Sequence, residues 1–126
     1  MRFYYYRKRN LLMNLLILGD IMGASGRRAL TNQLPHLIKD HKIGFVIVNG
    51  ENASDDGKGI TQEIADDFFK IGVDVITSGN HIWDKKETTE FIEKENRLLR
   101  PANLVSGSPG RGFKIYSSKN KKFKVG

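Results

Sequence analysis

The sequence predicts an α/β fold built around a parallel β-sheet. Short apolar segments at residues 14–18, 45–48 and 73–77 have the length and composition of buried strands. Segments with helical spacing of apolar residues separate them, over about 25–39 and 61–72. Strands that alternate with helices are typical of parallel sheets with right-handed crossovers, so we expect the three strands to share one sheet.

The elements of the first half are defined by where apolar residues stop and turn residues begin. The first strand ends at Gly19–Asp20, and the helix over about 25–39 follows it. The second strand, 45–48, ends in the polar run Asn49–Asn52. The apolar face of the first helix consists of Ala29, Leu30, Leu34, Leu37 and Ile38.

The second half repeats this pattern and then changes. A loop with two glycines, 53–60, leads to a helix that Thr61 is expected to cap. The third strand, 73–77, precedes the polar run Ser78–His81, and we expect a third helix over 85–96. The remaining elements are predicted to be a short strand within 98–103 and a hairpin formed by 113–116 and 123–125.

Composition indicates one soluble globular domain and excludes several kinds of site. The chain has 126 residues, of which 39% are apolar and 28% charged. It contains no apolar run of the roughly 18 residues that a membrane helix needs. The absence of cysteine excludes disulfides, zinc–thiolate sites, iron–sulfur clusters and a thiol nucleophile. We therefore expect a cytoplasmic protein without a membrane partner, in which any metal is held by oxygen and nitrogen atoms.

Basic residues concentrate at the two ends of the chain. The net charge is +7, but residues 1–13 carry four basic groups and residues 111–126 carry six, both without an acid. Residues 14–110 hold eleven basic and fourteen acidic groups, a balance of −3. Two interpretations are open: solvated ends of an ordinary chain, or attraction to nucleic acid or a membrane surface. We interpret residues 1–12 as an N-terminal extension and expect the domain to cover 13–126.

All three predicted strands end in side chains that can bind a cation. Ligands of an open α/β sheet bind beyond the carboxyl ends of its strands, so we expect these side chains at one edge. Carboxylates can bridge two hard cations about 3.5–4 Å apart, and such a pair clamps a phosphate and activates water. The competing interpretation is that Gly-Asp and Asn-Gly are ordinary turn sequences, but three consecutive strand ends of this kind favour a site. The candidates are the carboxylates of Asp20 and Glu51, the amides of Asn52 and Asn80, and the imidazole of His81.

Taken together, five motifs resemble the YmdB-like metallophosphoesterases of the calcineurin-like superfamily. The resemblance covers about Met13 to Gly126 and implies a calcineurin-like α/β/β/α sandwich with a dinuclear metal centre. It implies iron or manganese in that centre, with magnesium as the alternative, and phosphodiesterase activity on substrates such as 2′,3′-cyclic nucleotides. The motifs are Gly-Asp-Ile-Met-Gly (19–23), Asn-Gly-Glu-Asn-Ala (49–53), Gly-Lys-Gly-Ile-Thr (57–61), Gly-Val-Asp-Val-Ile-Thr-Ser-Gly-Asn-His-Ile-Trp-Asp (72–84) and Leu-Leu-Arg-Pro-Ala-Asn (98–103).

The resemblance also implies a role for each candidate residue. Asp20 would bind one metal and Asn52 would lie near it, Glu51 would bridge both metals, and Asn80 would bind the second. His81 would be the catalytic proton donor. In most of the superfamily a histidine lies two residues after the first aspartate, where this chain has Met22. Glu51–Asn52 likewise replaces an aspartate, and both departures are typical of the YmdB-like subfamily.

Several neighbouring residues have both a functional and a structural interpretation. Trp83 and Asp84 could wall the site or orient His81, whereas Asp84 would otherwise be the N-cap of the third helix. Lys58 between two glycines could touch a phosphate, or the loop could simply be mobile. The segment Arg100–Asn103 could belong to the site or form a structural turn.

The candidate ligands are too few for two metals. Two hard cations take roughly eight to twelve donor positions, and these residues supply about five. The family completes its centre with histidines from later in the chain, but no histidine follows His81. His36 and His41 are expected on the surface at the opposite edge of the sheet. We therefore expect a domain truncated at its C-terminus, comprising only the N-terminal half of the sandwich.

The leading functional hypothesis is a metal-dependent phosphodiesterase whose activity in this chain depends on the missing ligands. The first alternative is a non-catalytic module that binds phosphate or RNA through the partial site and the basic ends. An unfolded remnant is the third hypothesis. The sequence leaves open whether the chain forms a homo-oligomer.

Overall fold

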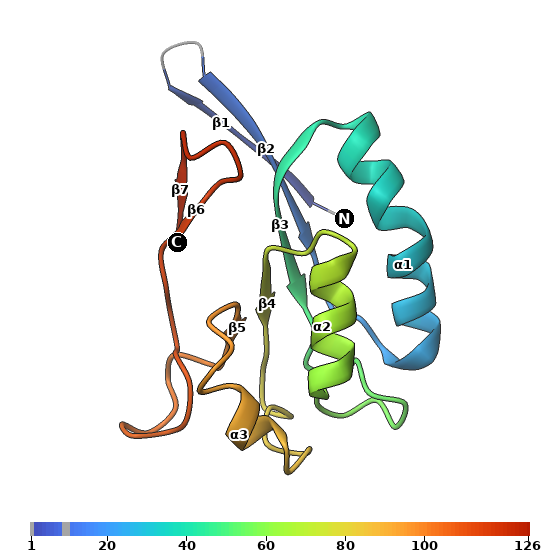
Figure 1. Ribbon diagram of the computed structural model, residues 1–126, viewed down its shortest axis with the longest axis vertical. Helices are drawn as coiled ribbons and strands as arrows, with labels where there is room; N and C mark the ends of the chain where they lie inside the picture. The colour runs from blue at the N-terminus through green and yellow to red at the C-terminus, as the bar shows by residue number, and fades with distance from the viewer. Residues whose placement is uncertain (1, 9–10) are drawn as a thin grey trace.

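The computed structural model describes residues 2–8 and 11–126, with side chains described from Met13 onward. It confirms a mixed α/β fold with a parallel sheet (Figure 1). The elements in chain order are β1 (Arg2–Lys8), β2 (Leu11–Leu18), α1 (Gly23–Asp40), β3 (Ile43–Asn49), α2 (Gln62–Lys70), β4 (Val75–Thr77), α3 (Thr88–Phe91), β5 (Leu98–Leu99), β6 (Tyr116–Ser117) and β7 (Lys124–Val125).

The main sheet has the strand order β1-β2-β3-β4-β5. Strands β2 to β5 are parallel, and β1 pairs antiparallel with β2 at the edge. Strand β3 lies beside β2, and β4 lies beside β3 on the side away from β2. Because the sheet grows in one direction, right-handed connections place α1 and α2 on the same face of the sheet (Figure 1). The carboxyl ends of the parallel strands consequently meet at one edge.

The core fills the space between this sheet and the two helices. Along each strand, side chains that face this core alternate with side chains on the other face of the sheet, because successive residues of a strand point to opposite faces. Thr61 caps α2 as predicted, because its hydroxyl accepts a hydrogen bond from the Ile64 N–H at 3.3 Å. The largest fully buried members of this core are Leu16, Leu34, Ile60, Phe68, Ile76, Ile82, Ile92 and Leu98.

The opposite face of the sheet carries a hairpin of β6 and β7, as predicted, but its first strand is Tyr116–Ser117 rather than 113–116. The Tyr116 ring lies 6.2 Å from the Phe45 ring, centroid to centroid. An apolar hollow remains beside this contact, lined by Ile47, Val75 and Leu99 among others. Phe113 and Ile115, just before the hairpin, are 82% and 67% exposed. The sheet is thus covered by helices on one face and by a small second sheet on the other.

Other predicted boundaries were also wrong, and two of them differ by three residues or more. Strand β2 begins at Leu11 rather than at residue 14, because its pairing with β1 extends it. The predicted helix over 85–96 reduces to the single turn of α3 within a series of turns. The Thr88 hydroxyl donates to the Ile60 carbonyl at 3.0 Å, so a tertiary hydrogen bond fixes this segment against the loop before α2.

The fold tests neither the predicted N-terminal extension, residues 1–12, nor the predicted cytoplasmic location of the protein. Residues 2–8 form β1, while residues 9–10 lie outside the described part of the chain, so the domain boundary at residue 13 stays a prediction. Within the described residues no helix is both long and apolar enough to cross a membrane. The cytoplasmic location also stays a prediction.

We expect Phe68→Ala to lower the free energy of unfolding by about 3–5 kcal/mol, because this ring is 1% exposed in the core under α2. Phe113→Ala removes the same ring from a site that is 82% exposed and should change it by less than about 0.5 kcal/mol. Urea denaturation followed by circular dichroism measures both. Equal losses in the two variants would contradict the position of the core.

Candidate functional site

The structure brings the predicted site residues to one edge of the sheet. Asp20 follows β2, Glu51 and Asn52 follow β3, and Asn80 and His81 follow β4. These strands are parallel neighbours, so their carboxyl ends converge below the sheet as Figure 1 is drawn. Backbone hydrogen bonds hold the three segments together, including Gly50 N–H to Thr77 O at 2.9 Å.

Asp20 and Asn52 are in direct contact. The Asn52 Nδ2 atom donates to Asp20 Oδ1 at 2.8 Å. An ionised carboxylate only accepts, so this bond fixes the orientation of the amide and turns its Oδ1 atom away. Asp20 has a φ of 48°, a left-handed conformation that aspartate tolerates better than most residues. The turn after β2 therefore presents its carboxylate to the segment after β3.

Glu51 lies against the backbone of the neighbouring strand end. A Cβ atom on Gly79 would lie 1.6 Å from Glu51 Oε2, so only glycine leaves room for the carboxylate in this place. The Gly59 N–H donates to the Glu51 carbonyl at 2.6 Å and fixes its backbone. The Glu51 side chain is therefore placed by the absence of a side chain at residue 79.

Three oxygen atoms of this strand end are buried without a hydrogen-bond partner among the described residues: Asn49 Oδ1, Glu51 Oε2 and Asn52 Oδ1. A buried polar atom left unpaired costs about 1–3 kcal/mol, so such atoms call for a partner. Carboxylate and amide oxygens are suitable ligands of hard cations. The donor set thus fits a metal ion, although the described residues contain no group of three or more His, Asp or Glu side chains that could hold one.

Asn49 is a candidate that sequence reasoning missed. It was assigned only to the end of the strand, and the sequence signal was its place in the same Asn-Gly-Glu-Asn run as Glu51 and Asn52. Its Oδ1 atom is buried and unpartnered, as the Asn52 Oδ1 atom is. This amide is therefore a further oxygen donor at the same strand end.

His81 is paired with Asp84. The His81 Nδ1 atom lies 2.9 Å from Asp84 Oδ2, and the two side chains are 30% and 38% exposed. A carboxylate acceptor places a hydrogen on Nδ1 and leaves Nε2 available to exchange a proton. The structural alternative for Asp84 was wrong, because α3 begins at Thr88 and Glu87 precedes it. Trp83 instead packs against the core.

The loop 53–60 is a set of tight turns. Ser54 N–H donates to Gly59 O at 3.0 Å, and Gly57 N–H donates to Ser54 O at 2.8 Å. Gly57 and Gly59 have φ angles of 74° and 76°, which favour glycine. Lys58 is exposed between them, and its contact with a phosphate stays a prediction.

The segment Arg100–Asn103 follows β5, the strand that pairs with β4. Arg100 Nη1 donates to the Pro101 carbonyl at 2.9 Å, a local turn contact, and Ser78 Oγ donates to Leu99 O at 2.6 Å beside the site. His36 and His41 are exposed near the end of α1, as expected.

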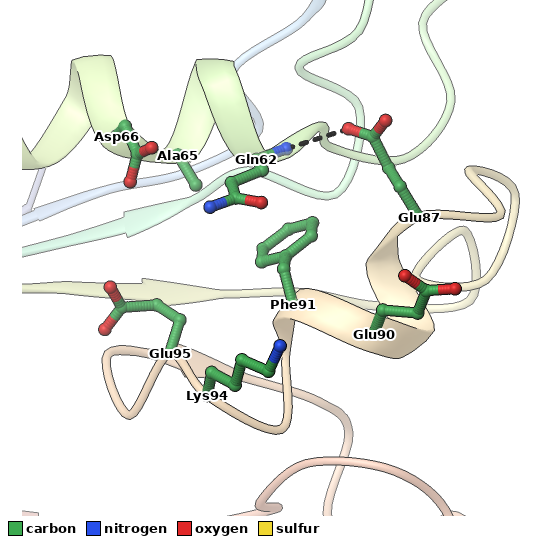
Figure 2. A pocket seen from close by; sticks show the side chains of 8 residues that line it. All are labelled: Gln62, Ala65, Asp66, Glu87, Glu90, Phe91, Lys94 and Glu95. Carbon is green, nitrogen blue, oxygen red and sulfur yellow. Dashed lines mark hydrogen bonds between the residues drawn. The ribbon is translucent and has the colours of Figure 1, made fainter.

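A separate hollow between α2 and α3 contains none of these residues (Figure 2). Figure 2 shows the Phe91 ring pointing toward Gln62 and carboxylates around the rim, of which Glu87 accepts from the Gln62 N–H at 3.0 Å. The oxygen atoms that could bind a metal ion lie at the strand ends, so this hollow is not part of the candidate site.

Comparison with known proteins identifies one family. The model of the family described as "YmdB-like protein" matches residues 16–126. The 2′,3′-cyclic-nucleotide 2′-phosphodiesterase of Bacillus subtilis is 42% identical over 113 residues, which are 90% of this chain and 42% of that protein.

Two solved structures share the fold. A hypothetical protein from Thermus thermophilus superposes with a TM-score of 0.75 at 36% identity, over 82% of this chain and 39% of that one. A novel phosphatase from Mycoplasma pneumoniae gives a TM-score of 0.77 at 31% identity, over 83% and 38%. The chain spans less than half the length of each relative.

We expect Gly79→Ala to displace the Glu51 carboxylate, because the new Cβ atom would overlap its Oε2 atom. The end of a glutamate side chain can rotate away, so the free energy of unfolding should change by no more than about 1 kcal/mol. Gly19→Ala is the control, since nothing lies within 4 Å of a Cβ atom there. Crystal structures of both variants give the position of Glu51, and an unmoved carboxylate in Gly79→Ala would contradict this packing.

Proposed function

Because the chain belongs to the YmdB-like family, whose model matches residues 16–126, we propose that it carries part of a metal-dependent phosphodiesterase centre. The observation that carries the proposal is the set of buried, unpartnered oxygen atoms of Asn49, Glu51 and Asn52, at a strand end in contact with Asp20. The name of the Bacillus subtilis relative supports phosphodiesters as substrates, and 2′,3′-cyclic nucleotides in particular.

Carboxylate and amide oxygens would hold the metal ions of this centre. Asp20 and Asn52 would hold one cation, Asn80 the second, and Glu51 would bridge them. The Asn49 amide would add a donor beside Glu51. When bound, two such cations neutralise a phosphate and activate a water. Iron or manganese is the proposed pair, with magnesium as the alternative, since each accepts oxygen ligands.

His81 would supply the proton that the leaving oxygen needs. Its Nδ1 atom is paired with Asp84, so the Nε2 atom is the one free to donate. The carboxylate of Asp84 orients the ring through its contact with Nδ1. Cleavage of a phosphodiester leaves an alkoxide on the nucleotide, and protonation by His81 would convert it to the hydroxyl product.

The donor set proposed here is incomplete for two cations. Roughly eight to twelve positions are needed, and Asp20, Asn49, Asn52, Asn80 and a bridging Glu51 supply about six. The relatives are more than twice as long as the matched stretch. We propose that polypeptide corresponding to their additional length provides further ligands, and that residues 13–126 form one part of the complete domain.

A second candidate function is RNA binding without turnover. It is favoured by residues 111–126, which carry six basic groups and no acid. Lys119, Lys121 and Lys122 are exposed in the turn of the β6–β7 hairpin. Binding of this kind would weaken steeply with salt, because it depends on released counterions.

We expect the chain, extended by the C-terminal segment of the Bacillus subtilis relative, to hydrolyse bis-p-nitrophenyl phosphate with added Mn²⁺ and to lose this activity with EDTA. Asp20→Ala and Asn80→Ala should abolish both bound manganese and hydrolysis, because each removes a proposed ligand. His81→Ala should retain manganese and lower kcat by about 10²–10⁴-fold, because it removes only the proton donor. His36→Ala, an exposed imidazole, is the control.

The same assays on the 126-residue chain separate the two candidate functions. Manganese binding that Asp20→Ala removes supports the phosphodiesterase centre even if turnover requires the extension. Salt-sensitive RNA binding that persists in Asp20→Ala, with neither metal binding nor hydrolysis in either chain, would refute the centre and favour the binding module.

A further inference from the structure

The loop 53–60 connects the two halves of the candidate site. It begins directly after Asn52, and its far end approaches the segment that carries His81. A Cβ atom on Gly59 would lie 3.1 Å from the His81 carbonyl oxygen. The Gly59 N–H also donates to the Glu51 carbonyl at 2.6 Å. The position of this loop therefore affects both the oxygen donors and the imidazole.

Arg27 of α1 holds the first part of the loop. Its Nη1 atom donates to the Ala53 carbonyl, and its Nη2 atom pairs with Asp55 Oδ1 at 2.6 Å. The Arg27 side chain is only 25% exposed. The planar guanidinium can serve both acceptors at once, which fixes direction as well as distance. One further bond joins α1 to this strand end, from Gly23 N–H to Asn52 O at 2.9 Å.

Lys85 holds the second part of the loop. Its Nζ atom pairs with Asp56 Oδ2 at 2.7 Å, and its side chain is 25% exposed. The pair joins the loop to the turn that follows His81 and Asp84. The hydrogen bond from Lys85, together with the Lys58 N–H, lowers the pKa of Asp56, so the carboxylate stays ionised near neutral pH.

The loop is buried at its two ends, at Ala53 and Ile60, and exposed in its middle, at Asp55 and Asp56. A hollow of about 530 Å³ lies between the loop and the start of α2, lined by both ion pairs and by side chains such as Glu63 and Asp67. The exposed middle of the loop borders this hollow. Arg27 and Lys85 are the side chains whose ion pairs cross from the loop to α1 and to the turn after His81, beside the Thr88 hydrogen bond to the Ile60 carbonyl.

We propose that Arg27 and Lys85 are positioning residues, which hold the loop 53–60 so that the Glu51 and Asn52 oxygens keep their place relative to His81. The inference rests on the proposed metal centre for its consequence but not for its geometry. Neither residue needs to touch a metal or a substrate in this role.

Hydrogen exchange of the metal-free chain tests the geometry. In Arg27→Met the Gly23 and Gly59 amides should exchange about tenfold faster, because a charge-assisted contact to a backbone carbonyl is lost. In Lys85→Met the Gly59 amide should exchange about threefold faster. The control is Lys70→Met, which breaks an ion pair to Asp67 with the same loss of charge on an exposed part of α2.

Manganese affinity of the same 126-residue chain tests the consequence. Arg27→Met should weaken Mn²⁺ binding by about tenfold or more, as outer partners of metal ligands commonly do. Arg27→Lys should not restore it, because one ammonium cannot replace the two-pronged guanidinium. Lys70→Met should stay within about twofold of the unaltered chain.

The outcomes separate this inference from the proposed function. If Arg27→Met and Lys85→Met exchange like Lys70→Met, the inference is overturned even when the unaltered chain binds manganese. If the exchange results hold and the unaltered chain binds none, the positioning role stands and the metal centre fails. If Arg27→Met does not fold, Asp55→Asn replaces it as the test, because it keeps the arginine and removes one acceptor charge. In that variant the Gly59 amide must exchange about threefold faster for the inference to stand.

Discussion

The parallel pairing of β2, β3 and β4 is the constraint on which the site depends. Each strand advances by one position in the same direction, so α1 and α2 lie on one face and the three carboxyl ends meet at one edge. Residues separated by about 30 positions in sequence are thereby brought within hydrogen-bonding distance, as Asp20 and Asn52 are. Without this topology the same side chains would be ordinary turn residues.

The site also carries a local cost that the fold must tolerate. Three oxygens are buried at the end of β3 without a partner among the described residues, and the turn after β2 holds Asp20 in a left-handed conformation. Neither feature stabilises the folded chain. Both are explained if the strand end is shaped for a cation and Gly79 is kept small so that the Glu51 carboxylate fits beside it. The core under α1 and α2 provides the stability that offsets this cost.

Sequence alone predicted the parts of this structure that depend on local pattern. Apolar strands followed by polar turns indicated which five candidate residues would share one edge of the sheet, and Thr61 indicated the start of α2. Prediction from sequence failed where a contact with a distant part of the chain decides the local structure. The segment 85–96 has charged residues at helical spacing, yet Thr88 is bonded to Ile60, 28 positions away, and only one helical turn forms. Arg27 gave no signal either, because its acceptors lie 26 and 28 positions along the chain.

The placement of the histidines determines what this segment can contribute. Helix α1 begins beside the site at Gly23 and runs for 18 residues, a length of roughly 27 Å, before it reaches Asp40. His36 and His41 therefore lie toward the opposite edge of the sheet and cannot approach a metal ion held by Asp20 or Glu51. His81 is the single imidazole at the site within the described residues, and its Nδ1 atom is paired with Asp84, which leaves Nε2 toward the site. In the proposed centre the described residues would therefore contribute oxygen ligands and one imidazole, and further nitrogen ligands would have to come from polypeptide or partners beyond them.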